Sequence, residues 1–247
     1  MRYLPVALAA VVFVVAWKLV VVIGSYPVFI LPSPETVAIR LIQAWAAGTM
    51  TPHALATLSE IGWGLLIGAL SAIVIGYVVA RSSLAERLFS PYLVAAQATP
   101  ILAIAPLLVL WLGTGLTPKV VICALIVFFP VAVATMVGIR SVDARLLELG
   151  QSLRATRWQI VRHLEIPAAL PQILGGLRVG ATLAVIGAIV GEWAGADRGL
   201  GYLINLARGS LFDTPLMFAT LMTLAAIGVL LYLGVVLLER VLVGAWR

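Results

Sequence analysis

The sequence predicts an all-α membrane protein in which residues 1–247 form a single domain with six transmembrane helices. The first observation is composition: 63% of the residues are hydrophobic and only 11% are charged. Soluble domains have about 45–50% apolar and roughly 25% charged residues, so a soluble core could not hide this much apolar surface. The second is a series of long apolar segments, and the third is an uneven distribution of arginines between the segments that connect them.

Six apolar segments approach or exceed the length of about 20 residues that a helix needs to cross a bilayer. The first is interpreted as a retained span, because no small-x-small cleavage site follows it. Ser33 and Pro34 are typical of a helix start, and Arg40 and Gln43 interrupt the apolar face that follows, so this helix is predicted to lie along the outer membrane surface. A short helix is also predicted around residues 202–208. The predicted spans cover about residues 4–24, 54–80, 88–112, 119–139, 172–193 and 216–238.

Proline and small residues indicate how some of these spans are built. The third span contains three prolines, which predict a broken or kinked helix. The second and fifth spans carry small residues at every fourth position, a pattern that lets a neighbouring helix approach closely. These rows are Gly64, Gly68, Ala72, Gly76 and Ala80 in the second span, and Gly176, Gly180, Ala184 and Ala188 in the fifth.

Charge predicts the orientation of the bundle. With the N-terminus inside, eleven of the sixteen Lys and Arg residues lie on the cytoplasmic side and four lie outside, with Lys18 within the first span. This positive-inside bias places both termini and the loop of residues 140–171 on the cytoplasmic side of the membrane. The net charge of +6 is explained by this orientation, and no basic cluster with interleaved aromatics indicates nucleic-acid binding.

The loop of residues 140–171 contains the most polar stretch of the chain, residues 148–171. Leu149, Leu153, Ile160 and Leu164 recur at helical spacing, which predicts an apolar stripe on a basic amphipathic helix. Three interpretations remain open: a solvated loop, a helix lying on anionic lipid, or a docking element for a soluble partner.

The same stretch resembles the cytoplasmic signature of the membrane subunits of binding-protein-dependent ABC importers. That signature reads Glu-Ala-Ala, three residues, Gly, nine residues, then Ile-x-Leu-Pro, and its spacing is kept throughout. The Ala pair is replaced by Leu149 and Gly150, and the Gly by Arg154. The later segments PAALPQILGGLRVG and VGEWAGADRGLGYLI also resemble this family, most closely its branch for sulfonates, nitrate, taurine, pyrimidine precursors and riboflavin-like compounds. Glu148 and Pro167 match by identity, and Leu164 and Ile166 match in kind.

The resemblance implies a type I ABC importer permease fold whose cytoplasmic coupling helix docks a separate ATPase. It further implies a second permease copy, most simply a homodimer, two ATPase subunits and an extracytoplasmic solute-binding protein. The chain would be a non-catalytic transport subunit without a cofactor, and ATP and magnesium would be bound by the partner ATPase. The positions implied in coupling are Glu148, Leu149, Gly150, Ser152, Leu153, Arg154, Ala155, Thr156, Trp158 and Pro167.

No motif for catalysis or metal binding is present in the sequence. It has no Gly-Lys dipeptide, GxSxG, HExxH or CxxC, and the predicted topology separates His53 from His163. A membrane enzyme is therefore disfavoured. A secondary transporter or channel that works without an ATPase remains an alternative, although it would leave the amphipathic loop unexplained.

Four polar residues within the predicted spans are candidates for the translocation pathway: Glu60, Gln97, Thr99 and Glu192. Ionisable groups in a membrane are costly and mark functional sites. The alternatives are that the two acids are interfacial carboxylates, paired with a helix end or an arginine, and that Gln97 and Thr99 satisfy carbonyls freed by Pro100. The acids disfavour an anionic substrate and favour a pyrimidine- or riboflavin-like heteroaromatic, with sulfonate, taurine or nitrate as the alternative.

Overall fold

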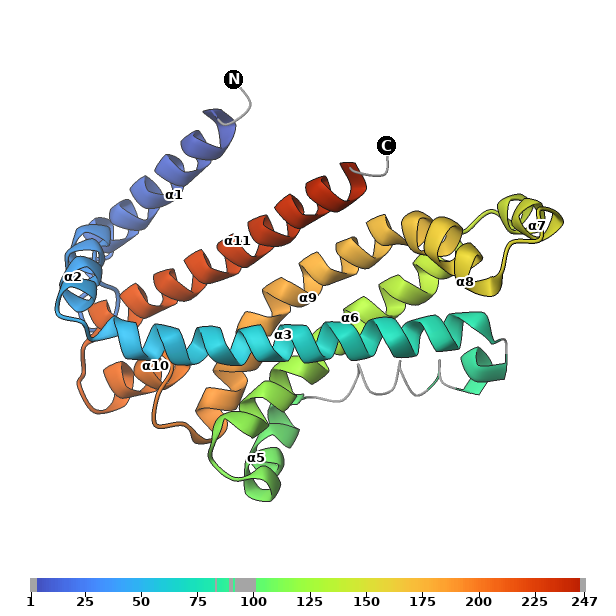
Figure 1. The fold of residues 1–247 in the computed structure, drawn as a ribbon. Helices are drawn as coiled ribbons and strands as arrows, with labels where there is room; N and C mark the ends of the chain where they lie inside the picture. Colours follow the sequence, from blue (N-terminus) through green and yellow to red (C-terminus); the bar gives the residue numbers. More distant parts are fainter. Residues whose placement is uncertain (1–3, 83, 89–90, 92–100, 245–247) are drawn as a thin grey trace. The chain divides into compact units, whose positions relative to one another are not determined.

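The computed structural model describes residues 4–82, 84–88, 91 and 101–244, and every regular element among them is helical. The prediction of an all-α fold is confirmed. Four helical segments are long and apolar enough to cross a membrane, namely Met50–Arg81, Leu116–Arg140, Arg157–Gly195 and Thr214–Gly244; Leu8–Ile23 and Ile101–Leu112 are shorter apolar helices. The elements are α1 (Leu4–Ile23), α2 (Pro34–Ala46), α3 (Met50–Arg81), α5 (Ile101–Leu112), α6 (Leu116–Arg140), α7 (Ala144–Ser152), α8 (Arg157–Ile160), the π-helix η1 (Val161–Glu165), α9 (Ile166–Gly195), α10 (Leu200–Gly209) and α11 (Thr214–Gly244) (Figure 1).

The chain divides into two compact units. The first comprises residues 1–56 and 197–225, and the second comprises residues 57–196 and 226–247. The first unit therefore holds α1, α2 and α10 with the starts of α3 and α11. The second holds the remainder of α3 and α11 together with α5 to α9.

In the first unit, ion pairs and caps fix the short helix α2. Ser33 caps it by accepting a hydrogen bond from the backbone N–H of Thr36, as the Ser33-Pro34 pair predicts. Lys18 of α1 donates a hydrogen bond to Glu35, and this bond lowers the pKa of the Glu35 carboxyl. The amphipathic helix is thus tied to the apolar helix that precedes it.

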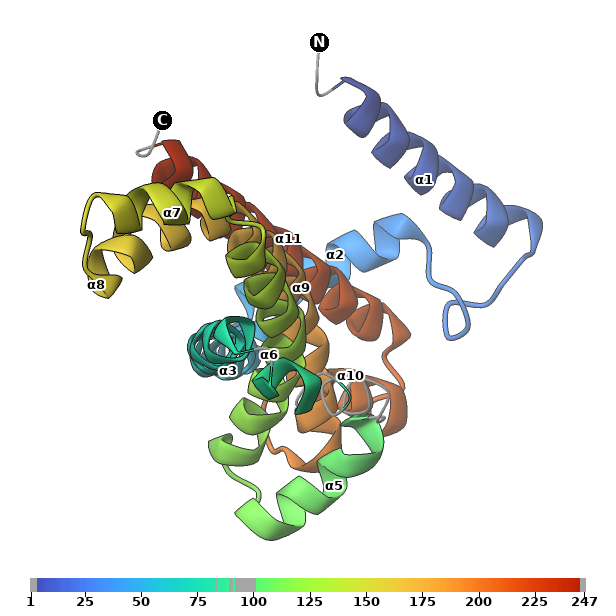
Figure 2. The same cartoon turned by 90° about the vertical axis from the view of Figure 1, so that its right-hand side faces the viewer.

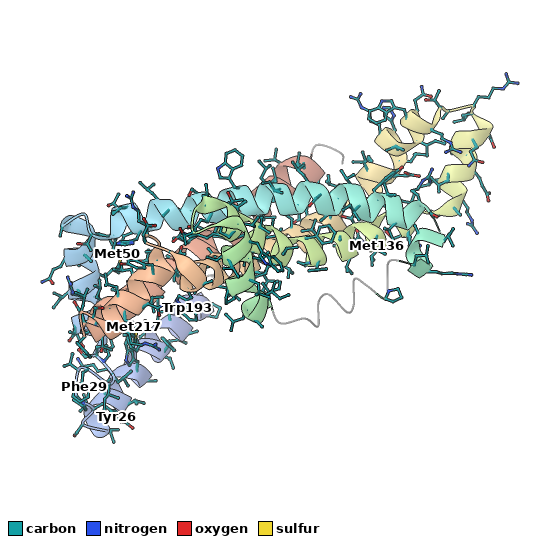
Figure 3. All side chains as sticks on the ribbon, turned by 90° about the horizontal axis from the view of Figure 1, so that it is seen from below. Tyr26, Phe29, Met50, Met136, Trp193 and Met217 are labelled. Atoms are coloured by element: carbon teal, nitrogen blue, oxygen red, sulfur yellow. The ribbon has the colours of Figure 1, made fainter. Side chains whose placement is uncertain are left out.

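The same unit joins α2 to the start of α11. The Arg40 Nε donates to Asp213 Oδ2 over 2.7 Å, while Asp213 Oδ1 accepts from the backbone N–H of Leu216 over 2.9 Å. The Thr214 hydroxyl donates to the Phe29 carbonyl over 3.0 Å. Figure 3 shows the side chains of Tyr26 and Phe29 projecting from the connection between α1 and α2.

In the second unit, α6 is the central helix, and the small-residue row of α3 packs directly against it. A Cβ built on Gly64 would lie 2.2 Å from the Cβ of Cys123, and one built on Gly68 would lie 2.6 Å from the Ala124 carbonyl oxygen. One built on Gly76 would meet the carbonyl oxygen of Ala132 at 2.8 Å. The row therefore provides the close approach that its spacing predicts.

The row of α9 packs against α6 in the same way. A Cβ on Gly176 would meet the Cβ of Ala134 at 2.4 Å, and a Cβ on Gly180 would lie 3.2 Å from a methyl group of Val127. Each row is thus a contact surface between helices, and α6 is enclosed by α3 and α9.

Two further helices complete the second unit. The helix α5 packs on α6 and α9 through Ala105, Ile122 and Val190, and it continues through Pro106. The part of the predicted third span at residues 92–100 lies outside the described residues. The later part of α11 is joined to α9 by an ion pair in which Arg178 Nη2 lies 2.6 Å from Glu239 Oε2.

Candidate functional site

The polar loop between α6 and α9 forms two short helices and not one. Asp143 caps α7 by accepting a hydrogen bond from the backbone N–H of Arg145, and the helix ends at Ser152. After a turn, α8 begins at Arg157 and continues through η1 into α9. Figure 2 shows α7 and α8 side by side. The prediction of one continuous amphipathic helix is wrong, because the chain reverses between Leu153 and Thr156.

The reversal is a left-handed helix cap centred on Arg154. Its φ is +56°, and its N–H donates to the Gln151 carbonyl over 2.9 Å. The N–H of Ala155 donates to the Gly150 carbonyl over 3.0 Å. These two bonds define a Schellman motif, in which glycine is the preferred residue at the left-handed position. Arg154 occupies this position, so it carries backbone strain that glycine would avoid.

The start of α8 is fixed by a reciprocal capping box. The backbone N–H of Thr156 donates to Gln159 Oε1 over 2.7 Å, and the N–H of Gln159 donates to the Thr156 hydroxyl over 3.3 Å. Both helix ends that flank the turn therefore have satisfied backbone groups, which holds the turn in one conformation.

Gly150 lies where the two short helices meet. It is buried, and a Cβ built on it would lie 3.1 Å from Leu164 Cδ1 and 3.5 Å from Ile160 Cγ1. Ile160 is buried and Leu164 is half-buried, so these two residues hold α7 against the helix that follows.

The other two leucines of the predicted stripe face outward. Leu149 is 56% exposed and Leu153 is 73% exposed, and Trp158 at the start of α8 is 67% exposed. The two-helix geometry explains why Leu149 and Leu153 are exposed while Ile160 is buried, because the turn separates the first two residues from the third. Of the other predicted coupling residues, Glu148, Ser152, Arg154 and Thr156 are exposed, Ala155 and Pro167 are half-buried, and Gly150 is buried.

The two predicted pathway acids lie in the core of the second unit. Glu60 is 1% exposed, and its Oε1 lies 3.0 Å from Lys119 Nζ, which is itself buried. Glu192 is 2% exposed, and its Oε1 accepts a hydrogen bond from the Thr57 hydroxyl over 2.6 Å. The ion pair between α3 and α6 has no sequence signal, since its members are 59 positions apart. Gln97 and Thr99 lie outside the described residues.

Glu165, at the end of η1, is buried and bound by two donors from α3, which sequence reasoning did not identify. Its Oε1 accepts from Arg81 Nη1 over 2.7 Å, and its Oε2 accepts from the Tyr77 hydroxyl over 2.9 Å. In the sequence, Glu165 is one of several charged residues in a polar loop. Its contact with α3 depends on the tertiary fold.

Within the described part of the chain, no three His, Cys, Asp or Glu side chains gather in a way that could hold a metal ion.

Comparison with known proteins matches residues 64–243 to the family described as "binding-protein-dependent transport system inner membrane component". A riboflavin transport system permease protein, RibX of Chloroflexus aurantiacus, is 47% identical over 240 residues, covering 97% of this chain and 88% of that protein. The formylaminopyrimidine transport permease protein ThiX of Halalkalibacterium halodurans is 37% identical over 219 residues, covering 89% and 86%. The taurine transport system permease protein TauC of Escherichia coli is 32% identical over 242 residues, covering 96% and 87%.

Solved structures share the fold at lower sequence identity. A chain of the MetNI methionine ABC transporter in an inward-facing conformation superposes with a TM-score of 0.65 at 21% identity, covering 77% of this chain and 94% of that one. A chain of an amino acid ABC transporter gives 0.61 at 22% identity, covering 83% and 97%. These similarities confirm the type I importer permease fold.

An apolar helical bundle with one polar loop is what a permease of this family is expected to have. Permease subunits of this kind are multi-pass inner-membrane proteins without catalytic activity, and they work with an ATPase and a binding protein. The chain belongs to the family of binding-protein-dependent transport system inner membrane components, the permease subunits of ABC importers.

Proposed function

We propose that this chain forms the translocation pathway of an ATP-driven importer together with a second copy of itself, and that α7 and α8 dock one ATPase subunit on each copy. The observation that carries the proposal is the exposed apolar surface of Leu149, Leu153 and Trp158 on a segment that leaves the apolar helices. Large apolar side chains exposed on a polar loop indicate a binding surface.

The residue types of this surface suit a protein partner. Burying one leucine contributes roughly 1.5–3 kcal/mol, and a tryptophan at the centre of an interface is a frequent anchor. Leu149, Leu153 and Trp158 could therefore supply much of the affinity of a small interface. In a loop that binds no partner, these apolar side chains would stay exposed to water, and no binding free energy would offset that unfavourable exposure.

The loop also presents this surface in a defined geometry. The Schellman turn at Arg154, the capping box of Thr156 and Gln159, and the seat of Gly150 against Leu164 restrict the backbone before a partner binds. Preorganisation of this kind lowers the entropic cost of association. Arg154 is exposed at the tip beside Leu153, where we propose that its guanidinium contacts an acidic or carbonyl-rich patch of the ATPase.

The proposed orientation places both termini and the loop in the cytoplasm, on the positive-inside distribution of arginines. Single cysteines test it in a Cys123→Ala background. An impermeant thiol reagent should label Ser210→Cys from outside and Ser152→Cys only after the membrane is opened. Labelling on the reverse sides would contradict the orientation.

The proposed substrate is a heteroaromatic vitamin precursor of the riboflavin or pyrimidine type, and it is supported by the similarity to RibX and ThiX. The charge argument against an anion carries less weight in the folded chain, because Lys119 neutralises Glu60. Sulfonate or taurine therefore remains the second candidate, supported by the similarity to TauC.

Our proposed pathway residues in the assembled importer remain Glu60, Gln97, Thr99 and Glu192. The burial of the two acids within one chain also supports a structural role, in which they hold α3, α6 and α9 together. The partners differ from the helix end or arginine considered from the sequence, because Glu60 pairs with Lys119 and Glu192 accepts from Thr57. Substitution of Glu60 by Gln separates the roles: a pathway residue changes uptake at unchanged thermal stability, whereas a bracing residue changes both.

Reconstitution tests the proposed function directly. The chain is purified with its ATPase, placed in proteoliposomes with the binding protein, and assayed for uptake of riboflavin, a pyrimidine precursor and taurine. Uptake that requires ATP and a stoichiometric P-loop ATPase is the expected result. Uptake driven by an ion gradient without any ATPase would contradict it and favour a secondary transporter or channel.

A further inference from the structure

The carboxylate of Glu165 joins two parts of the chain that are 84 residues apart. Its side chain is 2% exposed, and each of its oxygens accepts a hydrogen bond from α3, one from Arg81 Nη1 and one from the Tyr77 hydroxyl. Tyr77 and Arg81 are four residues apart and lie on one face at the end of α3. A buried carboxylate that is fully paired in this way holds its two helices in one relative position.

The backbone at Glu165 is also unusual. It ends the five-residue π-helix Val161–Glu165, which connects α8 to α9, and the N–H of Ile166 donates to the Val161 carbonyl. Such wide turns are rare and occur frequently at functional sites. In a regular α-helix, Ile160 and Glu165 would point about 140° apart. The wider π-turn reduces that angle, so Ile160 is buried beneath α7 while Glu165 is buried against α3.

The two short helices are joined to the bundle covalently at both ends, through residues 141–143 to α6 and through η1 into α9. They also contact α3 directly, through the hydrogen bonds of Glu165 with Tyr77 and Arg81. A force applied at α7 and α8 therefore reaches α6 and α9 through the backbone. Glu165 passes it directly to α3.

We propose that Glu165 is a positioning residue that couples the docking loop to α3, so that a displacement of the loop by the ATPase moves α3 together with α9. This inference rests on the proposed function, because it assumes that the ATPase binds α7 and α8. It identifies a direct contact that passes the movement of the loop during ATP hydrolysis to α3, a helix that is not adjacent to the loop in the sequence.

The test compares Glu165→Gln with a matched break elsewhere in the same unit, Glu239→Gln, in the reconstituted importer. Glu239 pairs with Arg178 between α11 and α9, so its loss removes an ion pair between helices without touching the loop. The measured quantities are co-purification of the ATPase, ATP hydrolysis, and substrate taken up per ATP hydrolysed.

For Glu165→Gln we expect the ATPase to remain bound and to hydrolyse ATP, while uptake per ATP falls on the order of 5-fold or more. Tyr77→Phe removes one of the two hydrogen bonds and should produce a smaller fall. For Glu239→Gln the ratio should equal that of the wild type. A ratio for Glu165→Gln that equals the wild type, or an equal fall in Glu239→Gln, would overturn the inference.

If Glu165→Gln assembles poorly with the ATPase, a covalent cross-link between positions 81 and 165 can replace the contact. In a Cys123→Ala background, Arg81→Cys with Glu165→Cys should couple poorly when unlinked. A short bismaleimide between the two thiols should restore uptake per ATP. Failure of the linked protein to recover would contradict transmission through this contact.

Different outcomes would contradict the proposed function and the role of Glu165. If the wild-type chain binds no ATPase and its uptake ignores ATP, the proposed function is wrong and the inference falls with it. If the wild type is coupled and Glu165→Gln is equally coupled, only the inference is wrong.

Discussion

Replacing Gly64 by alanine should destabilise the second unit more than the same change at Gly62, Gly68 or Gly76, the other glycines of α3. The Cβ introduced at Gly64 would lie 2.2 Å from the Cβ of Cys123, and carbon atoms in contact normally lie about 3.5–4.0 Å apart. The two helices must therefore separate by more than about 1 Å. Overpacking in a rigid core costs about 1–3 kcal/mol, and this clash belongs at the upper end of that range.

Gly62→Ala is the matched control, because it adds the same methyl group to the same helix with nothing within 4 Å of it. Alanine has the higher helix propensity, by up to about 1 kcal/mol, so this variant should be neutral or stabilised. The assay is the thermal unfolding midpoint of each purified chain in detergent, read by size-exclusion chromatography. Gly64→Ala should unfold at a lower temperature than wild type, and Gly62→Ala should not.

A double-mutant cycle assigns the loss to the Cys123 contact. Cys123→Gly removes the atom that the new methyl group meets, although the backbone of Cys123 and Ala124 still lies 3.3 Å away. Gly64→Ala should therefore be less destabilising in the Cys123→Gly background than in the wild type. Equal destabilisation in both backgrounds, or equal midpoints for Gly62→Ala and Gly64→Ala, would refute the packing of α3 on α6.

Three further substitutions test separate features. Arg154→Gly should relieve the left-handed strain and stabilise the loop turn by about 1 kcal/mol, seen as slower amide hydrogen exchange at Ala155; faster exchange would contradict the turn geometry. Lys119→Met should remove the cation that pairs with the buried Glu60, which costs up to about 3–5 kcal/mol of stability and lowers the thermal midpoint, whereas Glu60→Met in the same chain should recover part of the loss. Gln97→Leu should reduce uptake while the ATPase still co-purifies; unchanged uptake and hydrolysis would show that Gln97 only satisfies backbone carbonyls.

The parts of the fold that follow local rules could be predicted from the sequence. Apolar length predicted long helices, the Ser33-Pro34 pair predicted the start of α2, and the small-residue rows predicted close helix contacts. Each of these signals is contained within one helix or one turn, so no long-range information was needed.

The loop geometry could not be predicted in the same way. The spacing of Leu149, Leu153 and Ile160 fits one helix as well as two, and a left-handed turn is not expected at Arg154 because glycine is the usual residue there. The partners of Glu60 and Glu165 lie 59 and 84 positions away in the sequence. Which distant helix supplies a lysine or an arginine depends on the tertiary arrangement, and one sequence carries no signal for it.

Substitution of Leu153 tests whether an ATPase docks on α7 and α8. Leu153 is 73% exposed at the turn, so it supports no internal packing, and Leu153→Asp should leave the helices of the bundle folded. A carboxylate there would lose roughly 1.5–3 kcal/mol of apolar burial in the interface and place an unpaired charge within it. Leu153→Met keeps the apolar contact and is the matched control.

The measurement is ATP-driven uptake in proteoliposomes, made alongside co-purification of the ATPase with each variant. We expect Leu153→Asp to lose both the ATPase and the uptake, while Leu153→Met retains both. Wild-type uptake by Leu153→Asp would contradict the docking role of the loop.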